Sequence, residues 1–310
     1  MTWSVGAGLE GKGVVVTGAA GGIGKEVAKA FSTTGARVMV VDVKREAAES
    51  VLPELEGEGH RAVAADLTQF AAHDALIQRA RDELGSLYVL AHLAAVLRRR
   101  PSVDEVTEDD WDFQIDTNLK AAFFFCRAAA RSMVEQGRGG RIITFTSQGW
   151  WTGGFGGSVV YAASKGGITS MTRGLARTYG PHQITVNAVS PGQARTPMLM
   201  DGLDPQVLES MTRATPLGRI AEPEEIAGTV VFLGIDVQDL TSDAHAFLRR
   251  HNVSYASLRD NAGATYDGYG LTGVPETYWI DARGRIVAHF SGPVSSAQLD
   301  DGIRQATAAR

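Results

Sequence analysis

The sequence predicts an α/β fold in which helices cover both faces of a doubly wound parallel sheet. Two observations lead to this prediction: short, continuously apolar runs recur along the first two-thirds of the chain, and longer stretches with helical spacing separate them. Apolar strands that alternate with helices are typical of a parallel sheet buried on both sides. We expect strands at Gly13–Thr17, Arg37–Asp42, 61–65, 87–93, 141–146 and 185–188, and a first helix over 24–34.

Composition and charge exclude several classes of protein. The residues are 44% hydrophobic and 21% charged, which is ordinary for a globular protein. The length of 310 residues predicts about two domains. The net charge of −5 predicts no nucleic-acid partner and no attraction to an anionic membrane. The single cysteine, Cys126, excludes a disulfide within this chain, and the seven histidines show no metal-ligand spacing. Without a long apolar run or a signal-like amino terminus, we expect a cytoplasmic protein.

The pattern of the chain changes near Leu233. Beyond it we expect a helix over 242–251, an apolar stretch at 253–258 and a glycine-rich segment, followed by two close strands at Glu276–Ile280 and 285–290 around the turn 281–284. A last helix is expected over 296–308. We therefore predict two parts, 1–233 and 234–310.

A glycine-rich turn joins the first expected strand to the first helix. It contains Thr17, Gly18, Gly22, Ile23 and Gly24. Glycines allow the backbone to turn tightly and to approach a pyrophosphate, which the amino terminus of the following helix then faces. The turn therefore predicts a dinucleotide site, although such a turn alone also occurs in ordinary strand–helix connections.

Two further strand ends support this prediction. Asp42 ends the second expected strand, where a carboxylate accepts hydrogen bonds from the adenosine ribose and repels the extra phosphate of NADP. Lys44 and Arg45 weaken that repulsion, so the sequence favours NAD without excluding NADP. Asp66 and Leu67, after the third strand, could hold the adenine or simply form a turn.

Tyr161 and Lys165 are four residues apart, which places a phenol and an ammonium on one face of a helix. A free tyrosine titrates near pH 10, and a neighbouring cation is expected to lower that pKa. Proton exchange with a substrate hydroxyl would then become feasible. Ser147, at the end of an earlier strand, could bind the same substrate oxygen. Taken alone, Tyr161 and Lys165 would more often be two neighbouring residues on the protein surface. Because they follow the glycine-rich turn and Asp42 in this order along the chain, a catalytic role is favoured.

At this point residues 8 to about 233 resemble the short-chain dehydrogenase/reductase family. The resemblance is carried by several motifs in the family's order: the turn at 17–24, Asn118, Ser147, Tyr161 with Lys165, Asn187 to Gly192, Thr196-Pro197-Met198, Pro216 to Arg219 and Glu222 to Ala227. It implies a Rossmann-type sheet and a nicotinamide cofactor.

The resemblance also implies roles for individual residues. Tyr161 would be the general acid/base, while Lys165 would hold the nicotinamide ribose and lower the tyrosine pKa. Ser147 would polarise the substrate carbonyl, and Asn118 would anchor a water in a proton relay. Pro191 and Gly192 would flank the nicotinamide, with Thr196 reaching its carboxamide. The helices around 118–132 and 161–179 imply a homodimer.

Three departures from the family stand out. His92-Leu93-Ala94-Ala95 replaces Asn-Asn-Ala-Gly, so an amide that steadies the sheet is gone; His92 could replace it, but is more simply a polar strand end. The loop between Ser147 and Tyr161 is one residue longer, and its tryptophans, Trp150 and Trp151, could line the substrate side or cover a core edge. The family's last parallel strand is also missing.

In its place, residues 234–310 resemble the later part of a thioredoxin-like domain of the thiol-disulfide exchange type. The carrying residues are 231–239, 269–277 and 280–286, and the resemblance implies a cis Val274–Pro275 bond. The dithiol and the strand–helix unit that carries it are absent, so no thiol chemistry is expected. Over 229–236 the two families require different structures, a helix and a strand. We expect the tail to form a partial α/β unit packed against the dehydrogenase part.

The leading hypothesis is therefore an NAD-dependent enzyme that interconverts a secondary alcohol and a ketone of small to medium size. One alternative is an NADPH-dependent 3-oxoacyl thioester reductase, and another is a non-catalytic nucleotide-binding or interaction protein. Arg98, Arg99 and Arg100 could bind phosphate, but are more simply a solvated face. The run Phe123 to Cys126 is expected in the core or at a subunit contact, with Cys126 inert among apolar neighbours.

Overall fold

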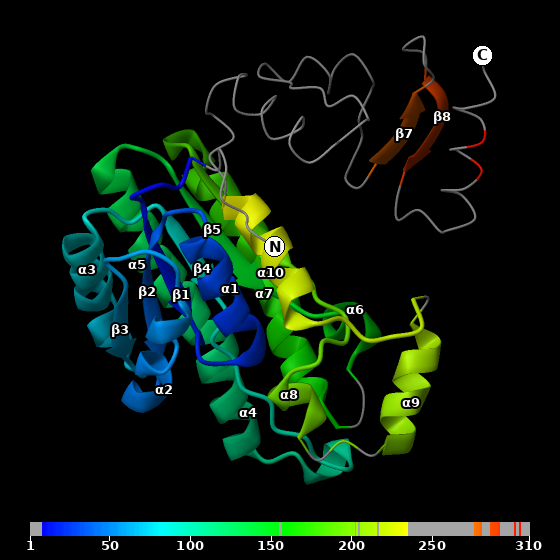
Figure 1. The fold of residues 1–310 in the computed structure, drawn as a ribbon. Helices are drawn as coiled ribbons and strands as arrows, with labels where there is room; N and C mark the ends of the chain where they lie inside the picture. The colour runs from blue at the N-terminus through cyan, green and yellow to red at the C-terminus, as the bar shows by residue number, and fades with distance from the viewer. Residues whose placement is uncertain are drawn as a thin grey trace. The chain divides into compact units, whose positions relative to one another are not determined.

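The computed structural model describes residues 8–154, 157–201, 203, 205–215, 217–234, 276–280, 286–291, 301 and 304. The chain divides into two compact units, Met1–Asn252 and Val253–Arg310. In the described part of the first unit, six strands form one parallel sheet with helices on both faces (Figure 1). This confirms the doubly wound α/β architecture.

The sheet has the strand order β3-β2-β1-β4-β5-β6. Its strands are β1 (Gly13–Thr17), β2 (Arg37–Asp42), β3 (Arg61–Ala64), β4 (Val89–His92), β5 (Gly140–Phe145) and β6 (Ile184–Val189). All six expected strands are present, two of them with the expected bounds. The chain proceeds from β1 to one edge and then returns to the other side of β1 with β4. That reversal separates the strand ends and opens a crevice in which doubly wound sheets bind ligands.

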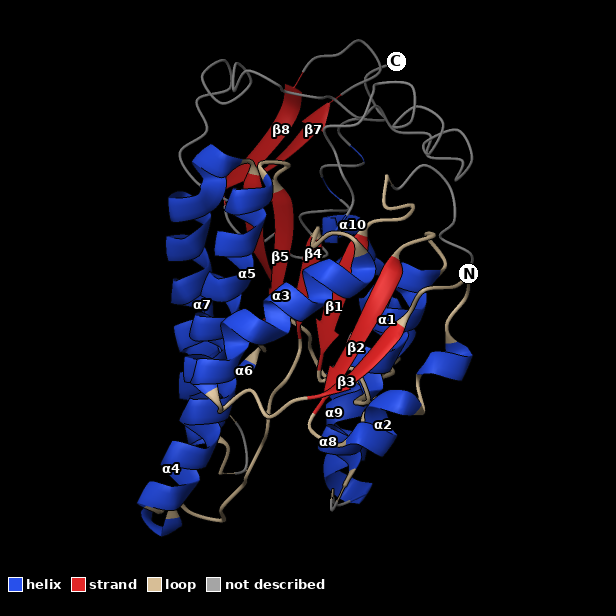
Figure 2. Cartoon of the chain, turned by 90° about the vertical axis from the view of Figure 1, so that its left-hand side faces the viewer, coloured by secondary structure: helices blue, strands red, loops and turns tan. Residues whose placement is uncertain are grey.

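The helices connect these strands. They are α1 (Gly22–Ser32), α2 (Arg45–Glu49), α3 (His73–Leu84), α4 (Glu108–Ile115), α5 (Ala121–Gln136), α6 (Gly149–Thr152), α7 (Val159–Tyr179), α8 (Pro197–Met200), α9 (Pro205–Ala214) and α10 (Pro223–Gly234). A π-helical turn, Asp116–Lys120, joins α4 to α5. Figure 2 shows α3, α5 and α7 on one side of the sheet and α1 with α10 on the other.

Two apolar cores lie on the two faces of the sheet. Val14 and Val16 point into the core beneath α1 and α10, whereas Val15 points into the core beneath α3, α5 and α7. All five residues of β1 are buried, which is why this strand is apolar without interruption. Phe125 and Cys126 are buried in the second core, and Phe123 is exposed, as expected of a core and surface helix.

Helix α10 settles the conflict over residues 229–236 as far as Gly234, because the chain is helical to that residue. Ala227, Val230 and Val231 are buried against the same core as α1. Their spacing of three and four residues brings one face of a helix onto the sheet, which a strand could not do. The dehydrogenase pattern therefore prevails in this segment.

In the second unit, the described residues include an antiparallel pair, β7 (Glu276–Ile280) and β8 (Ile286–Ser291). This confirms the two expected strands. Asp301 and Arg304 are helical and form an ion pair of 3.3 Å, which agrees with the expected last helix at those positions. The remaining expectations for the tail lie outside the described residues: the segments 242–251 and 253–258, the Val274–Pro275 bond and the contact with the first unit.

Among the described residues, no helix is long and apolar enough to span a membrane. The same residues contain no cluster of histidine, cysteine and acidic side chains that could hold a metal ion. Cys126 is buried, and burial raises the pKa of its thiol to about 12, so it is unreactive as expected.

Candidate active site

A cleft of about 1230 Å³ lies at the carboxyl ends of the parallel strands. It is lined by nearly all the residues that the sequence predicts for the site: Gly18, Gly22, Ile23, Gly24, Asp42, Asp66, Leu67, Ser147, Tyr161, Lys165, Pro191, Gly192 and Thr196. Thr17 and Asn118 are not among the lining residues. The fold therefore brings together residues from five strand ends and from helix α7 that are far apart along the chain.

The glycine-rich turn leaves the cleft open to a bulky ligand group. Gly18 has a φ of +63°, and a Cβ there would lie 2.8 Å from the backbone of Ala94. A Cβ on Gly24 would lie 2.1 Å from the Gly18 carbonyl oxygen. Helix α1 begins directly after this turn with no side-chain cap at Gly21 and no acidic residue in its first turn. Its free N–H groups and dipole suit a pyrophosphate.

Asp42 lies where β2 ends beside this turn. Its Oδ2 accepts a hydrogen bond of 3.0 Å from the Ala20 N–H, and its Oδ1 accepts one of 2.8 Å from the Val43 N–H. The carboxylate therefore orients the glycine-rich turn and still lines the cleft. These contacts fit a group that can also accept hydrogen bonds from a ribose.

Asp66 forms a turn at the end of β3. It accepts hydrogen bonds from the N–H and hydroxyl of Thr68, and these bonds lower the pKa of the carboxyl. Leu67 is buried next to it. The sequence left open whether Asp66 and Leu67 hold the adenine or form a turn. The turn is present, and both residues also line the cleft.

The opposite wall of the cleft follows β6. The Pro191 carbonyl accepts a bond of 3.2 Å from the Gln148 N–H. Thr196 caps α8 through its hydroxyl, and a Cβ on Gly22 would come within 3.0 Å of the Thr196 methyl carbon. Thr196 thus faces the glycine-rich turn across a narrow gap, and Pro191 and Gly192 line the same cleft.

Thr17 and His92 link two strands behind the cleft. The Thr17 hydroxyl is 3.0 Å from His92 Nδ1 and also accepts a bond of 3.2 Å from the Ala94 N–H. Both side chains are buried, and burial lowers the pKa of His92 to about 3. The sequence treated His92 as a simple strand end; the structure corrects this, because a neutral His92 joins β4 to β1. Thr17 has the same structural role and does not line the cleft.

Asn118 lies in the π-helical turn and is almost fully buried. Its Oδ1 accepts a bond of 2.7 Å from the Val96 N–H, and its Nδ2 donates to the Val96 carbonyl at 2.9 Å and to Ser164 Oγ at 3.3 Å. The side chain thus ties the loop after β4 to α7. A π turn is frequent at functional sites because it displaces one residue of a helix.

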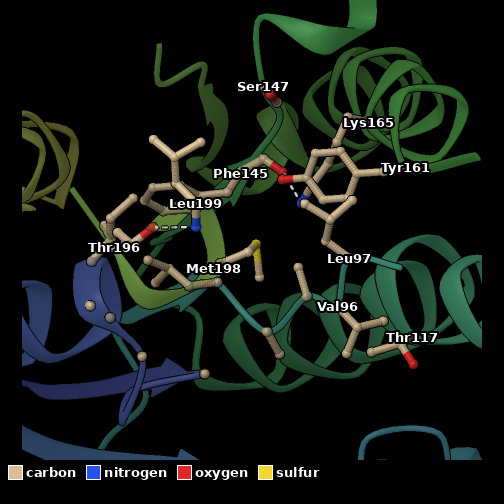
Figure 3. A pocket seen from close by; sticks show the side chains of 18 of the residues that line it. Val96, Leu97, Thr117, Phe145, Ser147, Tyr161, Lys165, Thr196, Met198 and Leu199 are labelled. Atoms are coloured by element: carbon tan, nitrogen blue, oxygen red, sulfur yellow. Dashed lines mark hydrogen bonds between the residues drawn. The ribbon is translucent and has the colours of Figure 1, made fainter. Parts of the chain in front are cut away.

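Tyr161 and Lys165 lie together on α7, and Figure 3 shows both side chains at one end of the cleft near Leu97. Lys165 Nζ is 5.4 Å from the centre of the Tyr161 ring and donates a hydrogen bond of 2.9 Å to the Phe145 carbonyl. Ser147 follows β5, and its Oγ accepts a bond of 3.2 Å from the Gly149 N–H. The three side chains occupy the positions that the sequence predicts.

The structure does not bear out the expected lowering of the Tyr161 pKa by Lys165. Burial raises the pKa of Tyr161 to about 12, and the opposing influences are a hydrogen bond with Ser147 and the charge of Arg99. Burial also lowers the pKa of Lys165 to about 8. The sequence shows that the two groups are adjacent, but it does not show how far folding shields each of them from water, which is the larger effect here.

The sequence also misjudged parts of the substrate side. Trp150 and Trp151 are 39% and 66% exposed, and neither is among the residues lining the cleft, so they do not line the substrate side. The apolar wall instead comes from the segment around α8 and α9, through Met198, Leu199, Leu203, Val207 and Met211. The spacing of four residues from 203 to 211 was a signal that could have identified it.

A crevice at the switch point of a parallel sheet, with an uncapped helix at one end and a half-buried phenol beside a buried lysine at the other, defines a nicotinamide-dependent oxidoreductase. A sequence-family model described as enoyl-(acyl carrier protein) reductase matches residues 18–244. The chain belongs to the short-chain dehydrogenase/reductase family, as the relatives below also show. It is an oxidoreductase that transfers a hydride between a nicotinamide and an alcohol or ketone.

Two curated relatives and one solved structure illustrate the similarity. D-threitol dehydrogenase of Mycolicibacterium smegmatis is 35% identical over 76% of this chain and 90% of its own length. The 5-keto-D-gluconate 5-reductase of Escherichia coli is 32% identical over 76% of this chain and 92% of its own length. A short-chain type dehydrogenase/reductase of Mycobacterium marinum is 32% identical, with a TM-score of 0.69 over 74% of this chain and 90% of its own.

Proposed function

We propose that this protein interconverts a secondary alcohol and a ketone with NAD, and that Tyr161 is the general acid/base. The observation that supports this most directly is the position of Tyr161 and Lys165, which lie on one helix and line the same cleft as the glycine-rich turn. Both binding and proton transfer can therefore be served by one continuous cleft.

The residues of the cleft fit a dinucleotide. The uncapped start of α1 and the glycines at 18, 22 and 24 would hold the pyrophosphate, and Asp42 would accept the adenosine ribose hydroxyls. Asp66 and Leu67 would border the adenine. Lys165 would hold the nicotinamide ribose; Pro191, Gly192 and Thr196 would flank the ring. The Asp42 carboxylate repels the extra phosphate that NADP carries on its adenosine ribose, so NAD is favoured over NADP.

When bound, the nicotinamide supplies or accepts the hydride. Tyr161 transfers a proton to the substrate oxygen in reduction and takes it back in oxidation. Burial raises the pKa of Tyr161 to about 12, so at neutral pH the phenol carries the proton that reduction requires. Ser147 would donate a hydrogen bond to the same oxygen. Asn118 would anchor a relay water, and its side chain holds the adjacent Val96 backbone.

Substitution of Tyr161 by phenylalanine tests this assignment. Tyr161→Phe removes the proton donor but leaves the ring in place, so turnover should fall by at least ~100-fold while calorimetry shows nearly unchanged NADH binding. A variant that keeps most of its activity on ketones would refute the role of Tyr161. If the wild type binds NADH but reduces no ketone in a broad panel, the protein is a non-catalytic nucleotide-binding protein.

A thioester reductase is the second candidate, because the matching family model is described as a reductase of acyl carrier protein substrates. Comparison of NADH with NADPH on a 3-oxoacyl thioester and on a simple ketone separates the two functions. A strong preference for NADPH and the thioester would favour this candidate over the first.

We also infer that two copies of this chain pair through α5 and α7. A shallow groove on these helices is lined by Phe123, Arg127, Met171, Gly174, Leu175, Thr178 and Tyr179. Phe123 is 38% exposed there, and a second copy would bury it. Light scattering on wild type and Phe123→Glu would test the homodimer, since a buried carboxylate should yield monomers.

For the remainder of the chain we propose a division at 233/234, with residues 234–310 as a truncated thioredoxin-like segment without thiol chemistry. The antiparallel pair β7–β8 supports this resemblance. Measuring NADH turnover of residues 1–233 beside the full chain would show whether the tail contributes to the reaction.

A further inference from the structure

The three consecutive arginines after β4 differ sharply in their partners. Arg98 donates to Asp109 at 2.6 Å and to Asp110 at 3.0 Å. Arg100 forms a two-bond contact with Asp110, at 2.7 Å from Nε and 2.7 Å from Nη2. Asp110 is buried, and these arginines hold the pKa of its carboxyl well below its usual range. Arg98 and Arg100 are therefore engaged in holding the loop, not in binding a ligand.

Arg99 behaves differently. It is exposed, it lines the cleft, and it has no hydrogen bond or ion pair with any residue that the structure describes. The positive charge of Arg99 favours the ionised phenol, so it partly offsets the effect of burial on the pKa of Tyr161. The free guanidinium thus lines the same cleft as Tyr161 and is near enough for its charge to act on the phenol.

The backbone around Arg99 is held in place on both sides. The Arg100 N–H donates to the Gly157 carbonyl at 3.3 Å, just before α7 begins. Gly157 has a φ of +74°, and a Cβ there would coincide with the Arg100 carbonyl, 1.4 Å away. On the other side, the Arg98 N–H donates to Gln114 Oε1 at 3.1 Å. A site whose backbone is already ordered loses little entropy when it binds a ligand.

We propose that Arg99 determines substrate specificity by binding a carboxylate of the substrate, so that the preferred substrates are keto acids and hydroxy acids. This rests on the proposed function. A guanidinium presents parallel N–H groups that match a carboxylate with two hydrogen bonds. The carboxylates of Asp109 and Asp112 also line the cleft, and they disfavour a doubly charged phosphate more than a singly charged acid.

The other side chains that line the cleft indicate the nature of the carbon skeleton between the carboxylate and the carbonyl group of the substrate. Met198, Leu199, Val207 and Met211 are apolar and line the same cleft, and Figure 3 shows Met198 and Leu199 across from Leu97. A carbon chain bound in this cleft can pack against these side chains. The structure therefore favours an acid with an apolar or sparsely hydroxylated skeleton.

Matched probes test the inference in two ways. The first is turnover of 4-oxopentanoate and 5-oxohexanoate beside their neutral amides. We expect the wild type to prefer the acids, and Arg99→Met to lower kcat/KM for the acids by about 10-fold to 100-fold, through KM, as the loss of a charged hydrogen-bonded contact requires. The amides should change far less, and Arg99→Lys should recover part of the preference.

The second readout is binding without turnover. With NADH-saturated protein, calorimetry should show pentanoate, a singly charged acid, binding more tightly than pentanamide, and Arg99→Met should remove that difference. Arg138→Met is the matched control, because Arg138 is exposed in the loop before β5, at the opposite edge of the sheet from the cleft. Equal binding of acid and amide by the wild type would overturn the proposal. Absence of all ketone reduction would instead count against the proposed function, while the binding result still decides the role of Arg99.

Discussion

Replacement of Lys165 by methionine should abolish turnover and yet stabilise the folded protein. Lys165 is 3% exposed, and burial lowers its pKa from 10.5 to about 8. A difference of about 2.5 in pKa corresponds to about 3 kcal/mol of cost for burying the cation. Methionine fills a similar volume without charge, but it leaves the Phe145 carbonyl without its donor, which costs about 1 kcal/mol. The expected net gain is about 2 kcal/mol at pH 7.

The gain should depend on pH in a defined direction. Below pH 8 the lysine is protonated in both the folded and the unfolded state, and the full cost of burial applies. Between about 8 and 10.5 the folded protein loses this proton while the unfolded chain retains it, so the wild type becomes more stable as the pH rises. The advantage of Lys165→Met over the wild type should therefore shrink by about 3 kcal/mol across this window.

Urea unfolding of wild type and variant, followed by circular dichroism at pH 7 and pH 10, measures this difference. Lys44→Met is the control, because Lys44 is exposed and its substitution should change stability by less than about 0.5 kcal/mol at either pH. A Lys165→Met protein that is less stable than the wild type at pH 7, or whose advantage is the same at both values, would refute the assignment of a buried, destabilising cation.

Two further predictions concern the residues at the strand ends. Asp42→Ala removes the acceptor of the Ala20 N–H and the charge that repels a ribose phosphate, so NAD should bind about 10-fold more weakly and NADP no more weakly than before; fluorescence titration with both reduced cofactors measures this, and an unchanged ratio of affinities would contradict it. His92 is neutral when folded, with a pKa of about 3, whereas the unfolded chain takes up its proton below about 6.5. The wild type should therefore lose about 2 kcal/mol between pH 6.5 and pH 5 that His92→Asn does not lose, as urea unfolding at both values can show; parallel losses in the two proteins would rule this out.

The elements of the sheet could be predicted because their signals are local. The strands Gly13–Thr17 and Arg37–Asp42 have the expected bounds, since each is a short run rich in valine that is flanked by turn residues. The cleft residues could be anticipated for a related reason. In a parallel sheet the carboxyl ends of all strands meet at one edge, so a motif after each strand contributes to one site.

Other features could not be predicted because they depend on contacts between residues that are far apart in the sequence. His92 looks like a polar strand end until Thr17, 75 residues away, is found beside it. Trp150 and Trp151 look like cleft residues because they are aromatic and follow Ser147, but α6 directs them to solvent. A pattern within a loop does not state which way the loop faces.

The amino-acid sequence alone determined the order of strands and helices, the glycine-rich turn and the adjacency of Tyr161 and Lys165, since each follows from spacing of a few residues. Only the tertiary structure decided the ionisation of these groups and the different roles of the three arginines. The pKa of a side chain depends on how much water and which charges surround it. Arg99 can be identified as a free guanidinium only once the structure shows that Arg98 and Arg100 are bonded to carboxylates. Both depend on the packing of distant segments, which local periodicity does not contain.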